Sequence, residues 1–538
     1  MSVSERTTMV DEAYDVVVAG GGAAGLSGAL ALARARRSVL VVDAGQPRNA
    51  PAGHAHNYLG REGTPPGELL ASGREELARY GGEVVTGRVE AVAKDGEGFL
   101  VTLDGGGSVR ARRLLWATGL ADELPDVPGL AQRWGKDVLH CPYCHGWEVR
   151  DRRIGVLATG PLSGHQVELW RQWSRDVHLL LHRTPALDDE RAERLAALGV
   201  TVVEGEVAGL EVDGDRLTGA RLASGEVVAL DALVVASRMT ARADLLEPLG
   251  LRAVPLEYGG HVVGTHLPAG PGGATDVPGV FVAGDVADLQ SGLIMAAATG
   301  TRAGAAINAD LVAEDARDAV EAYREQVRTM FEQEGWEERY RARPALWSGR
   351  PNPQLVAEAS DLAPGRALDV GCGEGADAIW LAGRGWRVSA VDISVTALER
   401  AAAHAAAEDA RAAERITWTH ADLREQPPAE GAYDLVSAQF MHLPSPARRE
   451  LFARLAAAVA PGGTLLIVGH HPSDLRANAH RMRFPDMMYT AEEVAAALDP
   501  AEWEVRTAET RARAAKNPEG EEVTVHDAVL VARRRPRG

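Results

Sequence analysis

Two cysteines separated by two residues, Cys141 and Cys144, are the side chains of this sequence best suited to carry out chemistry. Sulfurs at this spacing can close a small disulfide ring, and the thiolate form of either is the competent nucleophile. His140 and His145 bracket the pair, and an imidazole titrates near neutral pH, so either could accept a thiol proton. The pattern predicts a redox-active dithiol with a histidine base, for which His145 is the first candidate.

Half of a zinc site and two inert core cysteines are the alternatives for this pair. The chain contains one further cysteine, Cys372, and no second C-x-x-C, so the remaining ligands of a zinc cluster are missing. Three cysteines are also too few for a disulfide scaffold. We therefore expect no metal site here.

A glycine-rich turn near the amino terminus indicates the element that supplies a redox partner. An apolar run typical of a buried parallel strand precedes the turn, a helical stretch follows it, and an acidic residue ends the next strand. This is the pattern of a dinucleotide-binding βαβ unit, in which glycines let a pyrophosphate approach the helix and the acid binds ribose hydroxyls. A purely structural glycine turn is the alternative. The residues concerned are Gly20, Gly22, Gly25 and Asp43.

Two later segments, Leu114–Gly119 with its Ala-Thr-Gly turn and Gly279–Asp285, complete a set of motifs in order. The set resembles the flavoproteins of the thioredoxin reductase fold, which have two dinucleotide-binding domains. The resemblance implies FAD, with Thr118, Gly119, Gly284 and Asp285 as further binding residues and Asp285 on the ribityl chain. It also implies a flavin domain split into residues 13–128 and 246–315, an inserted domain at 129–245 that carries the dithiol, and a homodimer. In that family the second cysteine faces the flavin and the first meets the substrate.

The residues around the dithiol depart from thioredoxin reductases, which usually follow the pair with an acid. The sequence Cys-Pro-Tyr-Cys-His-Gly is similar instead to the dithiol oxidases that close the disulfides of gliotoxin- and holomycin-type natural products. The insert's own nucleotide turn departs from the G-x-G-x-x-G/A motif. Ala158 and Ser163 stand at the first and third small positions of the motif, and Pro161 removes a backbone donor. Arg183 is the single arginine at the place where arginine side chains would bind the 2′-phosphate of NADPH. NADPH is therefore an uncertain cofactor, and oxygen is the favoured electron acceptor.

A second glycine-rich loop follows a change of composition near residues 335–350. The segment Ala367–Gly375 opens another βα unit, and later strands end close to acidic residues. This part, residues 345–535, resembles class I S-adenosylmethionine-dependent methyltransferases, which implies a Rossmann-like fold and S-adenosylmethionine as methyl donor; the alternative is another nucleotide. The residues implied are Asp369, Gly371, Gly373 and Gly375 in the loop, Asp392 for the ribose, and Asp422 and Leu423 beside the adenine.

Catalysis by such enzymes mainly places a nucleophile in line with an activated methyl, so no signature base is required. Polar residues past the ends of the predicted strands could contact an acceptor, since ligands bind outside the carboxyl ends of parallel strands. The candidates are Gln439, Met441, His442, His470 and His471. A tract from Trp336 to Trp347 could cover the cofactor as a lid, and residues 316–344 are predicted to form a helical linker.

Charge and hydropathy restrict the partners. The formal net charge is −19, which would repel nucleic acid and anionic membranes. No apolar run reaches the length of a spanning helix and no targeting segment is recognised, so a cytoplasmic location is expected.

The α/β sequence thus predicts a bifunctional enzyme, an FAD-dependent dithiol oxidase joined to a methyltransferase, acting on small thiols or dithiols. An NADPH-dependent thioredoxin reductase fused to an unrelated methyltransferase, and a flavin redox sensor that gates one, are the alternatives.

Overall fold

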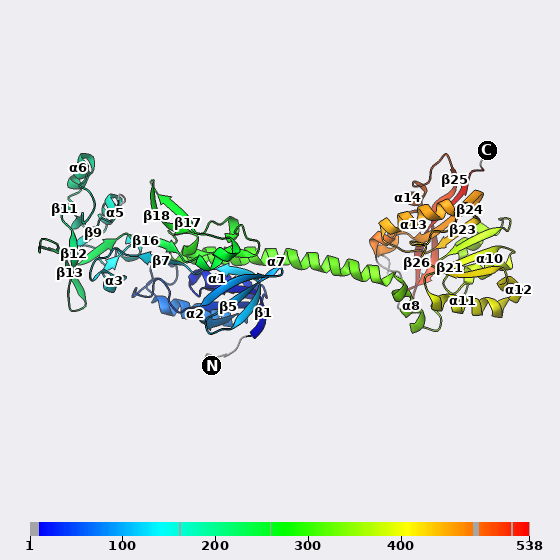
Figure 1. Ribbon diagram of the computed structural model, residues 1–538, viewed down its shortest axis with the longest axis horizontal. Helices are drawn as coiled ribbons and strands as arrows, with labels where there is room; N and C mark the ends of the chain where they lie inside the picture. Colours follow the sequence, from blue (N-terminus) through cyan, green and yellow to red (C-terminus); the bar gives the residue numbers. More distant parts are fainter. Residues whose placement is uncertain (1–9, 161–162, 259, 477–483, 518–519, 537–538) are drawn as a thin grey trace. The chain divides into compact units, whose positions relative to one another are not determined.

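The computed structural model describes residues 10–160, 163–258, 260–476, 484–517 and 520–536. The chain divides into two compact units, Met1–Ala316 and Arg317–Gly538 (Figure 1). The boundary falls inside one continuous helix, α7 (Leu293–Met330). Each unit is described separately below.

The first unit is built on a sheet with strand order β3-β2-β1-β6-β5-β4, to which β19 adds by pairing with β6. Its strands are β1 (Val10–Ala19), β2 (Val39–Asp43), β3 (Glu83–Thr86), β4 (Val89–Asp95), β5 (Gly98–Leu103), β6 (Ser108–Trp116) and β19 (Val280–Val282). Successive residues alternate between two apolar cores: Val16 and Val18 face the core that includes α1 (Ala23–Arg34), α2 (Pro66–Ala78) and the start of α7, whereas Val17 faces the core of the β4–β5 hairpin. The pairing of β19 with β6 joins two distant parts of the sequence into one domain.

The intervening chain forms three smaller sheets. One has the order β17-β18-β16-β7, another β11-β10-β9-β15-β8, and the third β12-β13-β14. All residues of β9 and β15 are buried, as a parallel sheet covered on both faces requires. The strands are β7 (Leu120–Glu123), β8 (Val138–Leu139), β9 (Ile154–Leu157), β10 (Val177–Leu180), β11 (Thr201–Val203), β12 (Val207–Asp213), β13 (Arg216–Leu222), β14 (Val227–Ala229), β15 (Ala232–Val235), β16 (Arg238–Ala241), β17 (Val254–Tyr258) and β18 (His261–His266). The helices and 3₁₀ turns are α3 (Leu130–Arg133), α4 (Pro142–His145), α5 (Ser163–Trp170), α6 (Asp189–Ala197), η1 (Asp244–Leu249), η2 (Pro271–Gly273) and η3 (Gly284–Val286).

The second unit is a doubly wound sheet with the order β22-β21-β20-β23-β24-β26-β25, in which β26 is antiparallel to both of its neighbours. Its strands are β20 (Arg366–Val370), β21 (Arg387–Asp392), β22 (Ile416–His420), β23 (Tyr433–Gln439), β24 (Val459–His470), β25 (Trp503–Lys516) and β26 (Glu522–Arg534). One core packs α13 (Ser445–Ala458) and α14 (Ala491–Ala495) on one face, and another packs α9 (Pro353–Ala359), α10 (Ala376–Gly383), α11 (Val395–Glu408) and α12 (Ala410–Ala413) on the other. Short 3₁₀ turns, η4 (Pro472–Arg476) and η5 (Pro485–Met487), follow β24.

Part of the segment predicted to be a linker belongs to the second unit. Helix α8 (Gln333–Ala342) contacts α11, and the Glu337 carboxylate accepts hydrogen bonds from the Thr396 amide, at 3.2 Å, and hydroxyl, at 2.6 Å. Phe331 and Tyr340 are buried. The polar composition that suggested a linker reflects one exposed face of an amphipathic helix, whose other face is packed.

The α/β fold class predicted for both parts is confirmed by this architecture. Among the described helices, none combines the length and apolar character needed to cross a membrane.

Candidate functional site

The first glycine turn has the geometry of a pyrophosphate cradle. Gly20 has φ +106°, and a Cβ there would come within 2.4 Å of the Ala117 carbonyl oxygen. A Cβ at Gly25 would come within 1.9 Å of the Gly20 carbonyl oxygen, so helix α1 can pack this closely only with glycine. Gly22, the N-cap of α1, has nothing within 4 Å of an added Cβ and faces open space. The three positions therefore serve a tight turn, close packing and close approach of a ligand, and these residues fit a dinucleotide.

A cavity of roughly 1880 Å³ extends from this turn to the dithiol. The predicted FAD residues Gly20, Gly22, Asp43, Thr118, Gly119, Gly284 and Asp285 line it, as do His140, Cys141, Cys144 and His145. Gly25 does not line the cavity, in keeping with its packing role. Asp43 ends β2 and accepts a hydrogen bond from Arg74 at 2.6 Å, which holds its carboxylate at the cavity wall. The fold thus brings one predicted cofactor site and the predicted redox pair into one space.

The dithiol lies at the start of the short helix α4, where Cys141 is the N-cap residue. The Cys144 thiol and the backbone amides of Cys144 and Tyr143 donate hydrogen bonds to the Cys141 sulfur, and these bonds outweigh burial and lower the pKa of Cys141 to about 6. The same thiol–thiolate hydrogen bond, together with burial, raises the pKa of Cys144. Cys141 is therefore the thiolate of the reduced pair at neutral pH.

The two histidines differ in their surroundings. Burial and, to a smaller extent, the positive charge of Arg48 lower the pKa of His140 to about 4, against the opposing effect of Asp122. Its Nδ1 atom is buried and has no hydrogen-bond partner among the described residues. Burial also lowers the pKa of His145, but the Glu148 carboxylate opposes the shift. Both imidazoles are thus neutral acceptors at pH 7.

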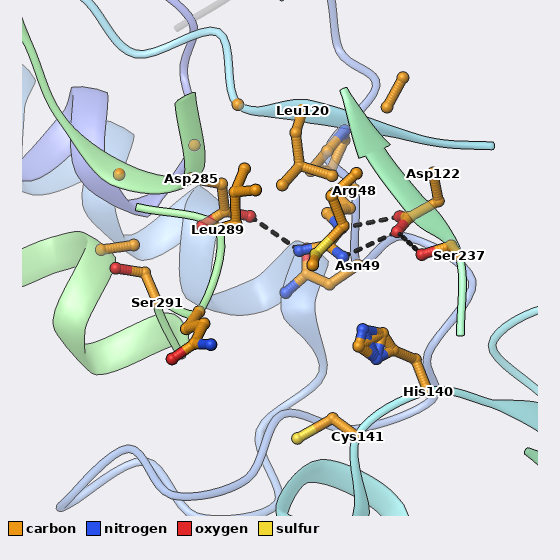
Figure 2. Close-up of a pocket in the computed structure, with 18 of the residues that line it drawn as sticks. Arg48, Asn49, Leu120, Asp122, His140, Cys141, Ser237, Asp285, Leu289 and Ser291 are labelled. Carbon is orange, nitrogen blue, oxygen red and sulfur yellow. Dashed lines mark hydrogen bonds and ion pairs between the residues drawn. The ribbon is translucent and has the colours of Figure 1, made fainter. Parts of the chain in front are cut away.

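An ion-pair cluster that no motif indicated lies beside these groups (Figure 2). Arg48, in the loop after β2, donates from Nε and Nη2 to the two carboxylate oxygens of Asp122, at 2.7 and 2.8 Å, and from Nη1 to Asp285 at 3.1 Å. The Ser237 hydroxyl donates to Asp122 at 2.6 Å. Burial alone would lower the pKa of Arg48, but the bonds and charge of Asp122 raise it, so Arg48 is a permanent cation.

The insert's own nucleotide turn uses two of its backbone amides within the turn itself. Ser163, the first residue of α5, accepts hydrogen bonds from the backbone amides of Thr159 at 3.1 Å and Gly160 at 3.4 Å. Such amides are the donors that a pyrophosphate would need. Arg183 donates to Glu206 at 2.6 and 2.9 Å. Pro161 lies outside the described residues.

The second glycine loop has a buried acidic environment. Burial raises the pKa of Asp369, with contributions from the neighbouring carboxylates Asp377 and Asp392, and its Oδ2 atom has no hydrogen-bond partner among the described residues. Asp392 ends β21 and accepts hydrogen bonds from the amides of Gly373 at 2.8 Å and Ser394 at 2.9 Å. An orphaned buried carboxylate oxygen suits a positively charged ligand, so these residues fit S-adenosylmethionine.

The aromatic tract predicted as a lid lies against this loop. A Cβ at Gly373 would come within 3.0 Å of the Tyr340 hydroxyl and 3.1 Å of Trp347 Nε1. The Glu374 carboxylate accepts hydrogen bonds from the amides of Leu346 and Trp347, both at 3.1 Å. Arg400 donates to Glu374 at 3.1 Å and to the Tyr340 carbonyl at 2.7 Å. We call these contacts of Glu374 and Arg400 the lid clasp.

The remaining residues predicted to bind ligands in the second unit lie in different surroundings. Asp422 pairs with Arg424 at 2.6 Å, and Leu423 packs at the edge of a core. Past β23 and β24, the rings of His442 and His470 stack with centroids 4.4 Å apart, and a Cβ at Gly371 would come within 2.4 Å of Met441 Sδ. His471 instead makes a local contact with Ser473, with His471 Nδ1 and Ser473 Oγ 2.8 Å apart. Within the described chain, no three His, Cys, Asp or Glu residues are grouped to hold a metal.

Comparisons with known proteins match both parts of the chain at the level of domains. The family model described as pyridine nucleotide-disulphide oxidoreductase matches residues 14–304, and a methyltransferase domain model matches residues 367–463. The chain is 32% identical over 314 residues to thioredoxin reductase tcpT of Claviceps purpurea, a match that covers 56% of this chain and 95% of that protein. It is 31% identical to thioredoxin reductase sirT of Leptosphaeria maculans, with 55% of this chain and 93% of that protein covered.

Solved structures give the same picture for the first unit. The crystal structure of HlmI is 44% identical, covers 60% of this chain and all of its own, and has a TM-score of 0.56. An oxidoreductase from Agrobacterium tumefaciens is 35% identical, with coverage of 56% of this chain and 98% of its own and a TM-score of 0.52. The chain therefore belongs to the pyridine nucleotide-disulphide oxidoreductase family, as a thioredoxin reductase-like flavoprotein domain followed by a methyltransferase domain.

Proposed function

We propose that the first unit is an FAD-dependent dithiol oxidase of the gliotoxin/holomycin type, using oxygen as acceptor, and that the second methylates small thiols with S-adenosylmethionine. The observation that carries the first half is the hydrogen bonding in the insert's turn. Ser163 accepts hydrogen bonds from the Thr159 and Gly160 amides, which the pyrophosphate of NADPH would otherwise need, although all three residues line the cavity that holds the dithiol and the FAD glycine turn. Electrons can therefore enter more readily from a dithiol than from a nicotinamide.

The reaction balances as a two-electron transfer. A substrate thiolate attacks one sulfur of the Cys141–Cys144 disulfide and releases the other cysteine as a thiolate. The second substrate thiolate then attacks the substrate sulfur of the mixed disulfide, the bond to the enzyme cysteine breaks, and the substrate leaves as a disulfide. The enzyme pair gains two electrons, and the substrate loses two protons, which His145 or His140 can accept because both are neutral. FAD, when bound at the glycine turn, would supply the acceptor for these two electrons, with oxygen as the final acceptor and hydrogen peroxide as its product.

In the second unit the residues present would orient a methyl donor. Asp392 would hold the ribose, Asp369 would face the positively charged end, and Tyr340 and Trp347 would cover the loop and exclude water. S-adenosylmethionine, when bound, supplies an activated methyl group. A thiol acceptor is inferred from the fusion, because both halves would then act on the same reactive group.

The test is oxygen uptake by the full-length protein. Reduced small dithiols should drive rapid oxygen consumption with peroxide formed in equal amount, and NADPH should support only slow reduction of the flavin. Cys141→Ser and Cys144→Ser should each abolish turnover and retain FAD, since the sulfurs act after the cofactor binds. Rapid NADPH oxidation coupled to thioredoxin would favour the reductase instead, the activity named for the two fungal relatives. Flavin that neither donor reduces at turnover rates would favour a redox sensor.

The methyltransferase half is tested with labelled S-adenosylmethionine and a panel of dithiols, monothiols, phenols, amines and metalloid oxyanions. Mass spectrometry should locate the methyl group on sulfur. Transfer to another atom while every thiol stays unmodified would show that the two halves do not share a substrate.

A further inference from the structure

Arg48 connects the two carboxylates of the flavin cavity to the dithiol. It arises from the loop after β2, Asp122 lies on β7, Asp285 lies in η3, and Ser237 immediately precedes β16. Two hydrogen bonds to Asp122 and one to Asp285 fix the plane of the guanidinium, and Figure 2 shows this cluster beside His140 and Cys141. Four separate segments thus converge to hold one cation in the cavity.

The described groups that face the Cys141 sulfur identify the source of positive charge. The Cys144 thiol and the amides of Cys144 and Tyr143 donate hydrogen bonds to this sulfur, and Arg48, which lines the same cavity, adds a smaller effect through its charge. The neighbouring imidazole of His140 faces Arg48, Asp122 and His145, and burial keeps its pKa at about 4. His140 is therefore neutral at pH 7 and cannot form an imidazolium–thiolate pair with Cys141. Arg48 is the cation that remains.

We propose that Arg48 is a positioning residue of the redox site, anchored by Asp122 and Asp285, which stabilises the Cys141 thiolate and leaves His140 neutral as a proton acceptor. Arg48 stabilises the thiolate and His140 accepts a proton, whereas a single histidine would otherwise have to do both. The inference rests on the proposed role of the Cys141–Cys144 pair, but not on the identity of the electron acceptor.

The sign of the effect follows from the charges. Loss of Arg48 removes one positive charge and leaves the carboxylates of Asp122 and Asp285 facing the cavity, so both the thiolate and its neighbours meet net negative charge. The pKa of Cys141 should then rise, and that of His140 should rise as well because Asp122 favours its protonated form. Removing the charge of Asp122 instead leaves Arg48 held by Asp285, and should keep the pKa of Cys141 constant or lower it.

The experiment measures alkylation of Cys141 by iodoacetamide as a function of pH in the reduced full-length protein, with peptide mass spectrometry to assign the site. Thiolate is the reactive form, so below the pKa the rate falls about tenfold for each unit by which the pKa rises. Arg48→Met should slow alkylation at pH 5.5 by about twofold or more, because Arg48 contributes the smallest of the effects that lower the pKa of Cys141. Arg48→Lys, which keeps the charge without the bidentate fork, should recover most of that loss. Arg61→Ala, at an exposed residue of the same loop, is the matched control.

Asp122→Asn separates an electrostatic role from a scaffolding role. If Arg48 acts by its charge, alkylation of Asp122→Asn at pH 5.5 should equal or exceed that of the parent protein. If Arg48 only holds the fold, breaking its ion pair should slow alkylation as Arg48→Met does, and that result would overturn the proposal. Unchanged alkylation in a folded Arg48→Met protein would overturn it too. Because alkylation requires no turnover, an inactive oxidase would leave this test intact.

Discussion

At the scale of single residues, the two histidines beside the dithiol, of which the sequence favours His145 as the base, have different surroundings in the structure. Glu148 supports protonation of His145, whereas Arg48 opposes that of His140, so His145 has the pKa nearer to neutrality and is the better base. His145→Ala should slow dithiol turnover about 10²- to 10⁴-fold, the usual contribution of an acid or base. His140→Ala, measured in parallel, should have the smaller effect, and the reverse order would assign the base to His140.

The pH dependence of kcat/KM is a second test at this scale. A base works in its neutral form, so activity should be lost as the pH falls through the pKa of His145. The negative charge of Glu148 raises that pKa, and Glu148→Gln should therefore move the acidic limb of the profile to lower pH. If the acidic limb of the kcat/KM profile does not move in Glu148→Gln, another group controls proton transfer.

At the scale of elements, helix α8 and the segment after it are held against the methyltransferase loop by the lid clasp. Glu374→Ala removes the acceptor of two backbone amides and the partner of Arg400. Hydrogen bonds to charged groups contribute about 1.5 to 3 kcal/mol, so S-adenosylmethionine should bind about 10- to 100-fold more weakly by calorimetry. Glu399→Ala, exposed on α11, is the control. Equal affinity in both variants would show that the tract does not cover the ligand.

At the scale of the whole molecule, the second unit should reach its full stability only with the residues that precede the predicted domain start at 345. The fragment 317–538 keeps Phe331 and Tyr340, which are buried at 4% and 2% relative exposure, whereas the fragment 345–538 lacks both. Loss of a buried aromatic side chain costs about 3 to 5 kcal/mol, which corresponds to a Tm lower by roughly 6 to 20 °C for a domain of this size. Thermal unfolding of the two fragments checks this, and equal Tm values would return α8 to the role of a linker.

The sequence alone determined the fold class and the two enzyme domains, because the signals for them are local. A strand, a glycine turn and a helix occupy about 30 contiguous residues, and only glycine satisfies the close contacts seen at Gly20 and Gly25. The dithiol and its flanking histidines are likewise adjacent in the chain. Residues of this kind can be recognised before any tertiary contact is known.

Tertiary structure alone decided which of these groups share a cavity and what charges surround them. Arg48, Asp122, Ser237 and Asp285 belong to no motif as a set, since they are far apart in sequence and meet only when β7, β16 and η3 assemble around the loop after β2. The pKa values of His140 and His145 depend on burial and on charges that are distant in the sequence. The sequence did not predict the packing of α8 for the same reason. A polar helix has the composition of a linker, and its contact with α11 becomes known only from the tertiary structure.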